Sequence, residues 1–204
     1  MICHKYKFIF IHIPKTGGTS VEKIFDRKAS VRNTRYKHST LQDLEKFRKV
    51  DNSYFKFSFV RNPWDMTVSM YHFLWHKDAK WPNRWRKKNK DLSCLSFKEW
   101  ILHPSFQGPT IRSIGIGKPF ACDGKFSDWL DSENHTMDFV GKFENFQQDF
   151  NIVCDNIGIP IQELPHENKS KHKNYTDYYD DETIAVVGSK YAEEIQKFNY
   201  KFGA

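Results

Sequence analysis

The stretch KFIFIHIPKTGGTS, residues 7–20, decides the fold class. It opens with an apolar run, residues 7–13, that is rich in Phe and Ile without clean alternation, which is typical of a strand covered on both faces in a parallel sheet. A turn with two adjacent glycines follows, and a helix is predicted from Ser20 to about Asp26 because apolar residues recur on one side. A strand, a glycine-containing loop and a helix in this order predict an α/β fold.

The loop PKTGGTS, residues 14–20, is the strongest chemical signal in the chain. Its adjacent glycines let backbone N–H groups turn toward one point, where the following helix also directs its positive end. Lys15 adds a positive charge beside Gly17 and Gly18, and hydroxyl groups come from Thr16, Thr19 and Ser20. The loop therefore predicts a phosphate site, against the alternative of a tight turn whose glycines only supply positive φ. It is not a Walker A loop, in which the Lys follows the glycines.

A second strand and helix carry another pair of anion-binding side chains. The strand is predicted over residues 54–60, and the helix begins with Asn62 at the N-cap and Pro63 in its first turn. Arg61 lies where the strand ends and Ser69 lies two turns along the helix, so both side chains can reach one anion near the carboxyl edge of the sheet. The Arg fork suits phosphate. The alternative is a surface Arg paired with a nearby Asp.

The rest of the chain alternates strand and helix signals. A capping box at Ser96 opens a short helix, a strand is predicted over residues 138–143, and a helix then runs to a stop at Gly158. One last helix begins near Asp181, and its apolar stripe continues to Phe198. These signals predict a single domain over residues 1–204, with a three-layer α/β/α architecture around a mainly parallel sheet. Two stretches rich in turns are interpreted as insertions: residues 76–93 and 104–132.

The composition excludes several classes of protein. Of the 204 residues, 28% are charged and 16% are aromatic, which suits a folded domain rather than a disordered chain. No apolar stretch has the length of a membrane anchor or the pattern of a signal peptide. Because the sequence begins almost at its first strand, a soluble, cytoplasmic protein of bacterial or viral type is expected. The four cysteines lie far apart, which predicts reduced thiols and no metal site. Most of the net charge of +7 lies in a basic loop, residues 77–90, with seven Lys and Arg against one Asp.

The glycine loop and the Arg–Ser pair together resemble the sulfotransferases that use 3′-phosphoadenosine 5′-phosphosulfate (PAPS), and more closely their carbohydrate-type branch. In that family a loop similar to FIHIPKTGGTS, residues 10–20, cradles the 5′-phosphosulfate. A strand that ends in Arg, with a Ser eight residues on, binds the 3′-phosphate there, and Arg61 and Ser69 have this separation. The resemblance implies a P-loop-like sulfotransferase fold, PAPS as co-substrate and no metal.

The acceptor hydroxyl needs a base, for which the family commonly uses a His or a Glu. His38 lies 23 residues before Arg61, a separation similar to that in family members with a catalytic His. A helix opened by Thr40 follows, and its N-terminus disfavours the imidazolium and keeps the ring able to accept a proton. His38 is the predicted base, against the alternatives of a plain loop residue at this position and of Glu144 as the base. His12 is interpreted as a core residue or one that supports the site.

The resemblance extends to PHENKSKHKNYTDYY, residues 165–179, which is similar to a family loop that closes over the nucleotide. It implies further contacts to the 3′-phosphate from Ser170, Lys171 and Lys173. The alternative is a solvated, charged loop.

The predicted function is sulfuryl transfer from PAPS to a hydroxyl acceptor, with Lys15 stabilising the leaving phosphate. The acceptor is expected to be a glycan, and an acidic or already sulfated one if the basic loop binds it; no nucleic acid is expected. The main alternative is a binding protein that keeps the fold but uses the basic loop on RNA or another anionic polymer, because Trp residues lie among its charges. A kinase-like phosphoryl transferase is disfavoured because no magnesium-binding carboxylate pattern stands out.

Overall fold

The computed structural model describes residues 1–25, 38–47, 50–75, 94–104, 106, 125–165 and 172–204. The chain divides into two compact units. The first comprises Met1–Arg61 with Phe126–Asn168, and the second comprises Asn62–Lys125 with Lys169–Ala204. The basic loop, Cys122 and most of the two expected insertions lie outside the described residues. The single domain expected from the sequence stays a prediction.

The first unit is built on a mixed sheet of four strands in the order β1-β2-β3-β4. These strands are β1 (Ile2–Cys3), β2 (Phe8–Ile11), β3 (Phe55–Val60) and β4 (Phe139–Lys142). The short β1 pairs antiparallel with β2, while β2 pairs parallel with β3 and β3 parallel with β4. The α/β class predicted from the sequence is confirmed. Because β2 and β3 are parallel neighbours, both strands end at the same edge of the sheet.

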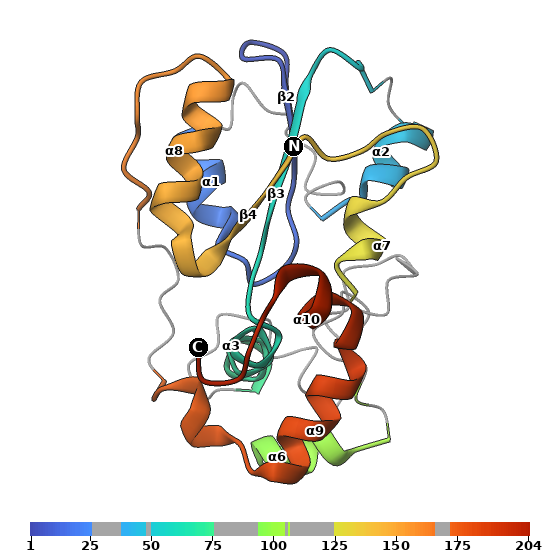
Figure 1. The fold of residues 1–204 in the computed structure, drawn as a ribbon, viewed down its shortest axis with the longest axis vertical. Helices are drawn as coiled ribbons and strands as arrows, with labels where there is room; N and C mark the ends of the chain where they lie inside the picture. The colour runs from blue at the N-terminus through green and yellow to red at the C-terminus, as the bar shows by residue number, and fades with distance from the viewer. Residues whose placement is uncertain (26–37, 48–49, 76–93, 105, 107–124, 166–171) are drawn as a thin grey trace. The chain divides into compact units, whose positions relative to one another are not determined.

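Helices flank this sheet on two sides (Figure 1). One side carries α1 (Gly18–Ile24) and α8 (Phe146–Asn156). The other side carries α2 (Leu41–Phe47) and the short α7 (Ser127–Leu130). Helix α7 lies inside the stretch that the sequence marks as a turn-rich insertion, and it buries Trp129 and Leu130. Part of that stretch therefore contributes to the packing of the first unit.

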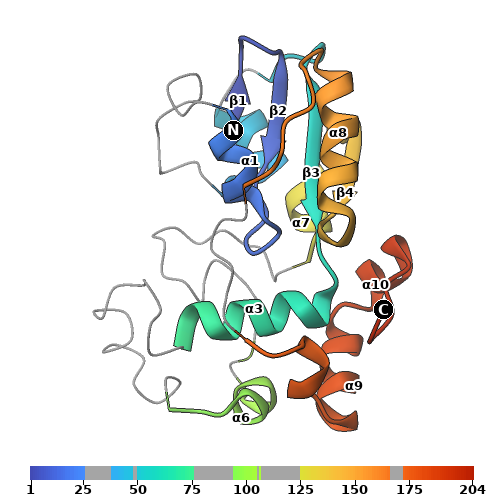
Figure 2. The ribbon, with the colours of Figure 1, turned by 90° about the vertical axis from the view of Figure 1, so that its left-hand side faces the viewer.

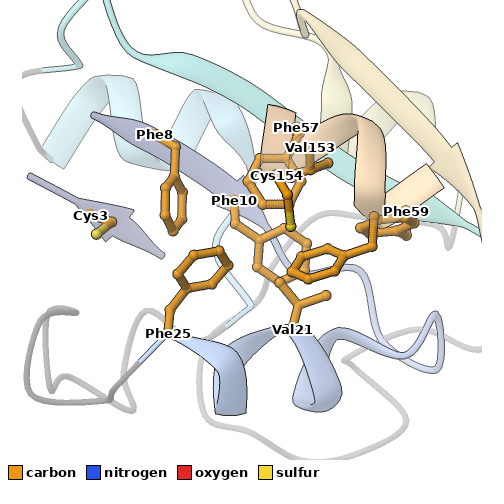
Figure 3. Close-up of a cluster of buried hydrophobic side chains, with 10 residues drawn as sticks. Cys3, Phe8, Phe10, Val21, Phe25, Phe57, Phe59, Val153 and Cys154 are labelled. Atoms are coloured by element: carbon orange, nitrogen blue, oxygen red, sulfur yellow. The ribbon is translucent and has the colours of Figure 1, made fainter. Parts of the chain in front are cut away.

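An aromatic cluster fills the space between the sheet and the pair α1 and α8 (Figure 3). Its buried members come from β1, β2, β3, the two helices and the residue that ends α1: Cys3, Phe8, Phe10, Val21, Phe25, Phe57, Phe59, Phe150, Val153 and Cys154. Burying each Phe side chain contributes about 1.5–3 kcal/mol. Gly141 on β4 faces Phe59, and a Cβ there would lie 2.5 Å from Cε1 of that ring. The glycine therefore lets the Phe59 ring lie against β4.

The second unit is helical in its described part (Figure 2). Its elements are α3 (Pro63–Trp75), α6 (Phe97–Leu102), the 3₁₀ turn η4 (Tyr175–Tyr178), α9 (Asp181–Lys190) and α10 (Ala192–Phe198). Helix α9 packs against both α3 and α6. The predicted capping box at Ser96 is confirmed, since its side chain accepts from the Glu99 N–H.

The expectation of one continuous last helix is wrong. The chain leaves helical geometry at Tyr191, with φ −109° and ψ 26°, and α10 then starts at Ala192. The Tyr191 ring is fully buried. Apolar spacing continues unchanged across this residue, so periodicity alone cannot reveal the break.

Within the described residues, no helix is long and apolar enough to cross a membrane. No cluster of His, Cys, Asp or Glu among these residues could hold a metal ion. Cys3 and Cys154 are buried thiols.

Candidate functional site

The glycine loop joins the end of β2 to the start of α1 through two residues with left-handed backbone conformation. Lys15 has φ 67° and Gly17 has φ 83°. A non-glycine residue in this region costs of order 1 kcal/mol or more and persists only where the surroundings fix it. Thr16 supplies one such restraint, because its buried hydroxyl donates to the Ile13 carbonyl at 2.9 Å. The loop is therefore held in one tight conformation, and the Thr16 hydroxyl proton is already used inside it.

The two adjacent glycines are required for different reasons. Gly17 is the N-cap of α1 and needs its positive φ, and a Cβ there would also lie 2.6 Å from Cζ of Phe146. Gly18 does not have positive φ. A Cβ on Gly18 would instead lie 2.2 Å from Cδ2 of His12, so the His12 ring occupies the space of a side chain. The second glycine is thus fixed by packing against His12.

Lys15 and Arg61 meet at the edge where β2 and β3 end. Arg61 Nη1 donates to the Lys15 carbonyl at 3.0 Å, and its guanidinium lies 4.2 Å from the centroid of the Phe143 ring. Burial, and then the charge of Arg61, lower the pKa of the Lys15 ammonium to about 8. The arrangement brings two cations to one place, where a bound anion would reduce their mutual repulsion.

His12, Glu22 and His38 form a hydrogen-bonded group beside the loop. His12 is 4% exposed, and its Nδ1 lies 2.8 Å from Oε1 of Glu22 on α1. His38 Nδ1 lies 2.9 Å from the His12 carbonyl oxygen, and the two imidazole rings meet edge to face at 4.4 Å. The His38 ring also lies edge to face with the Trp129 ring, at a centroid distance of 6.5 Å. The structure thus places His38 next to the start of the glycine loop.

The predicted helix start after His38 is also present. Asp43 N–H donates to Thr40 Oγ1 at 3.0 Å, and Thr40 N–H donates to Asp43 Oδ2 at 3.2 Å. This reciprocal pair caps α2 and fixes the residues just before it.

The comparisons with known proteins bear on this geometry. The model of the Sulfotransferase family matches residues 1–201. This chain belongs to the sulfotransferase family. It is 25% identical to human carbohydrate sulfotransferase 9 over 95% of the chain, and it spans about half, 47%, of that relative's length. It is also 27% identical to an uncharacterized protein of Archaeoglobus fulgidus over 63% of the chain and 88% of that protein. No solved structure matches.

The other predicted site residues of this chain are distributed as follows. Thr19 is half-buried and Ser20 is buried in the first turn of α1, where the Ser20 N–H donates to the Gly17 carbonyl at 2.8 Å. Ser69 is buried in α3 of the second unit, whereas Arg61 closes a segment of the first. Their joint contact with one phosphate stays a prediction. Lys173 is exposed. Ser170 and Lys171 lie outside the described residues.

Sequence reasoning missed two residues of this site. Glu22 has a signal that could have found it, because a buried imidazole such as that of His12 requires a polar partner and α1 offers a nearby carboxylate. Phe143 has no such signal, since its position over the Arg61 guanidinium depends on how β4 ends. Glu144, the alternative base, is exposed in the 3₁₀ turn η3 (Phe143–Asn145).

Proposed function

We propose that this sulfotransferase transfers a sulfuryl group from PAPS to the hydroxyl group of a carbohydrate. The observation that carries the proposal is the pair of cations, Lys15 and Arg61, held together at the end of two parallel strands. The two anionic groups of the nucleotide, one at each cation, would offset their repulsion and raise the pKa of the lysine toward its usual value. The proposal includes the three-layer, P-loop-like arrangement expected from the sequence.

The glycine loop is proposed to hold the 5′-phosphosulfate. No described side chain caps the start of α1, so backbone N–H groups of its first turn can face an anion. Lys15 adds a charge, and Thr19 and Ser20 add hydroxyl donors. Thr16 contributes through its backbone, since its hydroxyl proton is bonded to the Ile13 carbonyl. Gly17 and Gly18 let the chain approach the anion closely.

The 3′-phosphate is assigned to Arg61 and Ser69, with Ser170, Lys171 and Lys173 as further contacts. Arg61 donates one N–H to the Lys15 carbonyl. A guanidinium has five N–H donors in a planar fork, so this bond is compatible with a second, bidentate contact to phosphate.

The chemistry assigned to the chain is an in-line displacement at sulfur. His38 accepts the proton of the acceptor hydroxyl as its oxygen bonds to sulfur, and the bond from sulfur to the bridging oxygen breaks. Lys15 stabilises the negative charge that grows on the 5′-phosphate of the departing adenosine 3′,5′-bisphosphate. The products are a sulfate ester and the bisphosphate. The similarity to human carbohydrate sulfotransferase 9 supports a carbohydrate acceptor.

The proposal is tested by transfer from ³⁵S-labelled PAPS to a panel of neutral, acidic and partly sulfated glycans. The wild-type protein is expected to release adenosine 3′,5′-bisphosphate in step with labelled glycan. The His38→Ala variant should lose about 10²- to 10⁴-fold of that rate, because general base catalysis contributes this much. Binding of PAPS without transfer to any hydroxyl compound would contradict the enzymatic function.

A further inference from the structure

The hydrogen bond from His38 determines which of its ring nitrogens can act as a base. The partner of His38 Nδ1 is the backbone carbonyl of His12 at 2.9 Å, and a carbonyl oxygen only accepts. His38 Nδ1 must therefore carry the hydrogen. In the neutral ring the lone pair then lies on Nε2, which is the atom available to take a proton.

The residue that supplies this carbonyl is itself fixed on three sides. His12 Nδ1 donates to Oε1 of Glu22 at 2.8 Å, with side-chain exposures of only 4% for His12 and 12% for Glu22. One edge of its ring packs against the backbone of Gly18. The ring also stacks on Phe10 at 5.8 Å. Neither the ring nor the backbone of His12 can shift without disturbing the glycine loop.

A merely structural role for His12 and Glu22 does not explain why this pair contacts His38. A buried carboxylate costs several kcal/mol of desolvation unless it is hydrogen-bonded, and an apolar pair would fill the same space without that cost. The pair instead connects α1, the end of β2 and the ring of His38, whose centroid is 4.4 Å from that of His12. It therefore links the helix behind the glycine loop to the proposed base.

We propose that Glu22 and His12 are positioning residues for His38. Glu22 fixes the His12 ring, and His12 holds His38 through its carbonyl and ring edge in the tautomer that leaves Nε2 as the proton acceptor. This inference rests on the proposed function, in which His38 is the base. Glu22, the carboxylate that restrains the base, lies in α1, the helix that follows the glycine loop.

The first test measures the tautomer directly in the full-length protein with ¹⁵N-labelled histidine. Long-range ¹H–¹⁵N spectra near neutral pH are expected to give His38 as the Nδ1–H form in the wild type and in Glu22→Gln, whose amide oxygen still accepts from His12. In Glu22→Ala the two tautomers of His38 should become mixed. A wild-type His38 with its hydrogen on Nε2, or an unchanged tautomer in Glu22→Ala, would overturn the inference.

The second test separates positioning from binding. Glu22→Ala should lower kcat for transfer to the best glycan of the panel by about tenfold or more, while the Kd for adenosine 3′,5′-bisphosphate stays near the wild-type value. Glu22→Gln should recover most of the rate. Glu163→Ala, which removes an exposed carboxylate of the same unit, is the matched control and should change neither quantity. Equal loss of rate and of bisphosphate affinity would mean that Glu22 only stabilises the loop.

The outcomes distinguish this inference from the proposed function. If His38→Ala retains full transfer while the spectra show the expected tautomer, the base has been assigned wrongly although the geometry is correct. If His38→Ala is inactive but the tautomer does not respond to Glu22→Ala, the base is right and the positioning role is wrong.

Discussion

Two strand–turn–helix segments of this chain, β2–α1 and β3–α3, look similar in sequence but start their helices in opposite ways. After β2, helix α1 begins behind a left-handed glycine, Gly17, and no described side chain caps it. After β3, helix α3 begins at Pro63, and Asn62 caps it from within: its Oδ1 accepts from the Trp64 N–H at 3.1 Å. The Asn62 carbonyl also accepts from the Met66 N–H at 2.8 Å.

The difference indicates how each segment can bind an anion. The uncapped start of α1 leaves N–H donors for a ligand, so the β2–α1 segment can bind through its backbone. The start of α3 offers fewer donors, because Pro63 has no N–H and the Trp64 N–H is bonded to Asn62, so an anion at the β3–α3 segment must be bound mainly by side chains such as Arg61. Changes of shape should therefore damage the β2–α1 segment most, and changes of charge the β3–α3 segment. Lys15 adds a charge to the β2–α1 segment and is the exception.

Replacing Lys15 should have the largest effect. We expect Lys15→Ala to lower kcat by about 10²-fold or more, because the ammonium acts on charge that develops only as the leaving phosphate departs. The Kd for adenosine 3′,5′-bisphosphate should rise much less. Lys23→Ala removes an exposed charge from α1, the helix that follows the loop, and is the control. A Lys15→Ala enzyme with normal kcat and only a raised KM for PAPS would limit Lys15 to binding.

A change of shape in the β2–α1 segment should have the second largest effect. Gly18→Ala would force a Cβ to 2.2 Å from the His12 ring. Overpacking of this kind typically costs about 1–3 kcal/mol, which corresponds to a roughly 5- to 150-fold weaker bisphosphate if the cost falls on the loop geometry. Calorimetric titration measures the affinity for the bisphosphate. Gly188→Ala is the control, since a Cβ there meets only Trp64, at 3.3 Å. Unchanged affinity in Gly18→Ala would contradict binding through the backbone of this loop.

The pH dependence of binding should follow Lys15. Its pKa of about 8 in the free protein means that the ammonium is charged below that pH and progressively neutral above it. Since an anion favours the charged form, bisphosphate affinity should be nearly level below about pH 7 and begin to fall as the pH approaches 8. It should then fall by up to about tenfold per pH unit until the pKa of the bound lysine is reached. In Lys15→Gln the fall should vanish. A wild-type affinity that rises with pH would contradict the expectation that deprotonation of Lys15 weakens binding.

The smallest effect on binding is expected at the cap of α3. Asn62→Ala removes this cap and the bond from Asn62 Nδ2 to the Lys201 carbonyl at 2.9 Å, and should lower the free energy of unfolding by about 1–3 kcal/mol. Bisphosphate affinity should not change, because the cap is satisfied inside the protein. Chemical denaturation and calorimetry on one preparation measure both quantities. A marked loss of affinity with unchanged stability would show that Asn62 contacts the ligand.

Features that depend on neighbouring residues along the chain were predictable from the sequence. The cap at Asn62, the capping box at Ser96 and the helix start after His38 each require only residues within three positions, and each is confirmed. The strand, glycine loop and helix were recognisable for the same reason.

Features that depend on contacts across the fold were not predictable. Gly18 is required by the His12 ring, six residues earlier, rather than by its own backbone angles. The Arg61 contact with the Lys15 carbonyl joins residues 46 positions apart. The residue patterns at these positions do not encode which ring or carbonyl packs beside them, so the support of the site by Glu22 emerged only from the structure.

The central claim is that this chain binds the nucleotide of PAPS through two anion sites. Calorimetric titration of the wild type and Arg61→Ala with adenosine 3′,5′-bisphosphate and with AMP tests it most directly. The wild type should bind the bisphosphate at least about tenfold more tightly than AMP, since a charge-assisted bond to the 3′-phosphate contributes about 1.5–3 kcal/mol. Arg61→Ala should lose most of that preference while its AMP affinity changes little. Equal wild-type affinities for the two nucleotides would contradict the claim.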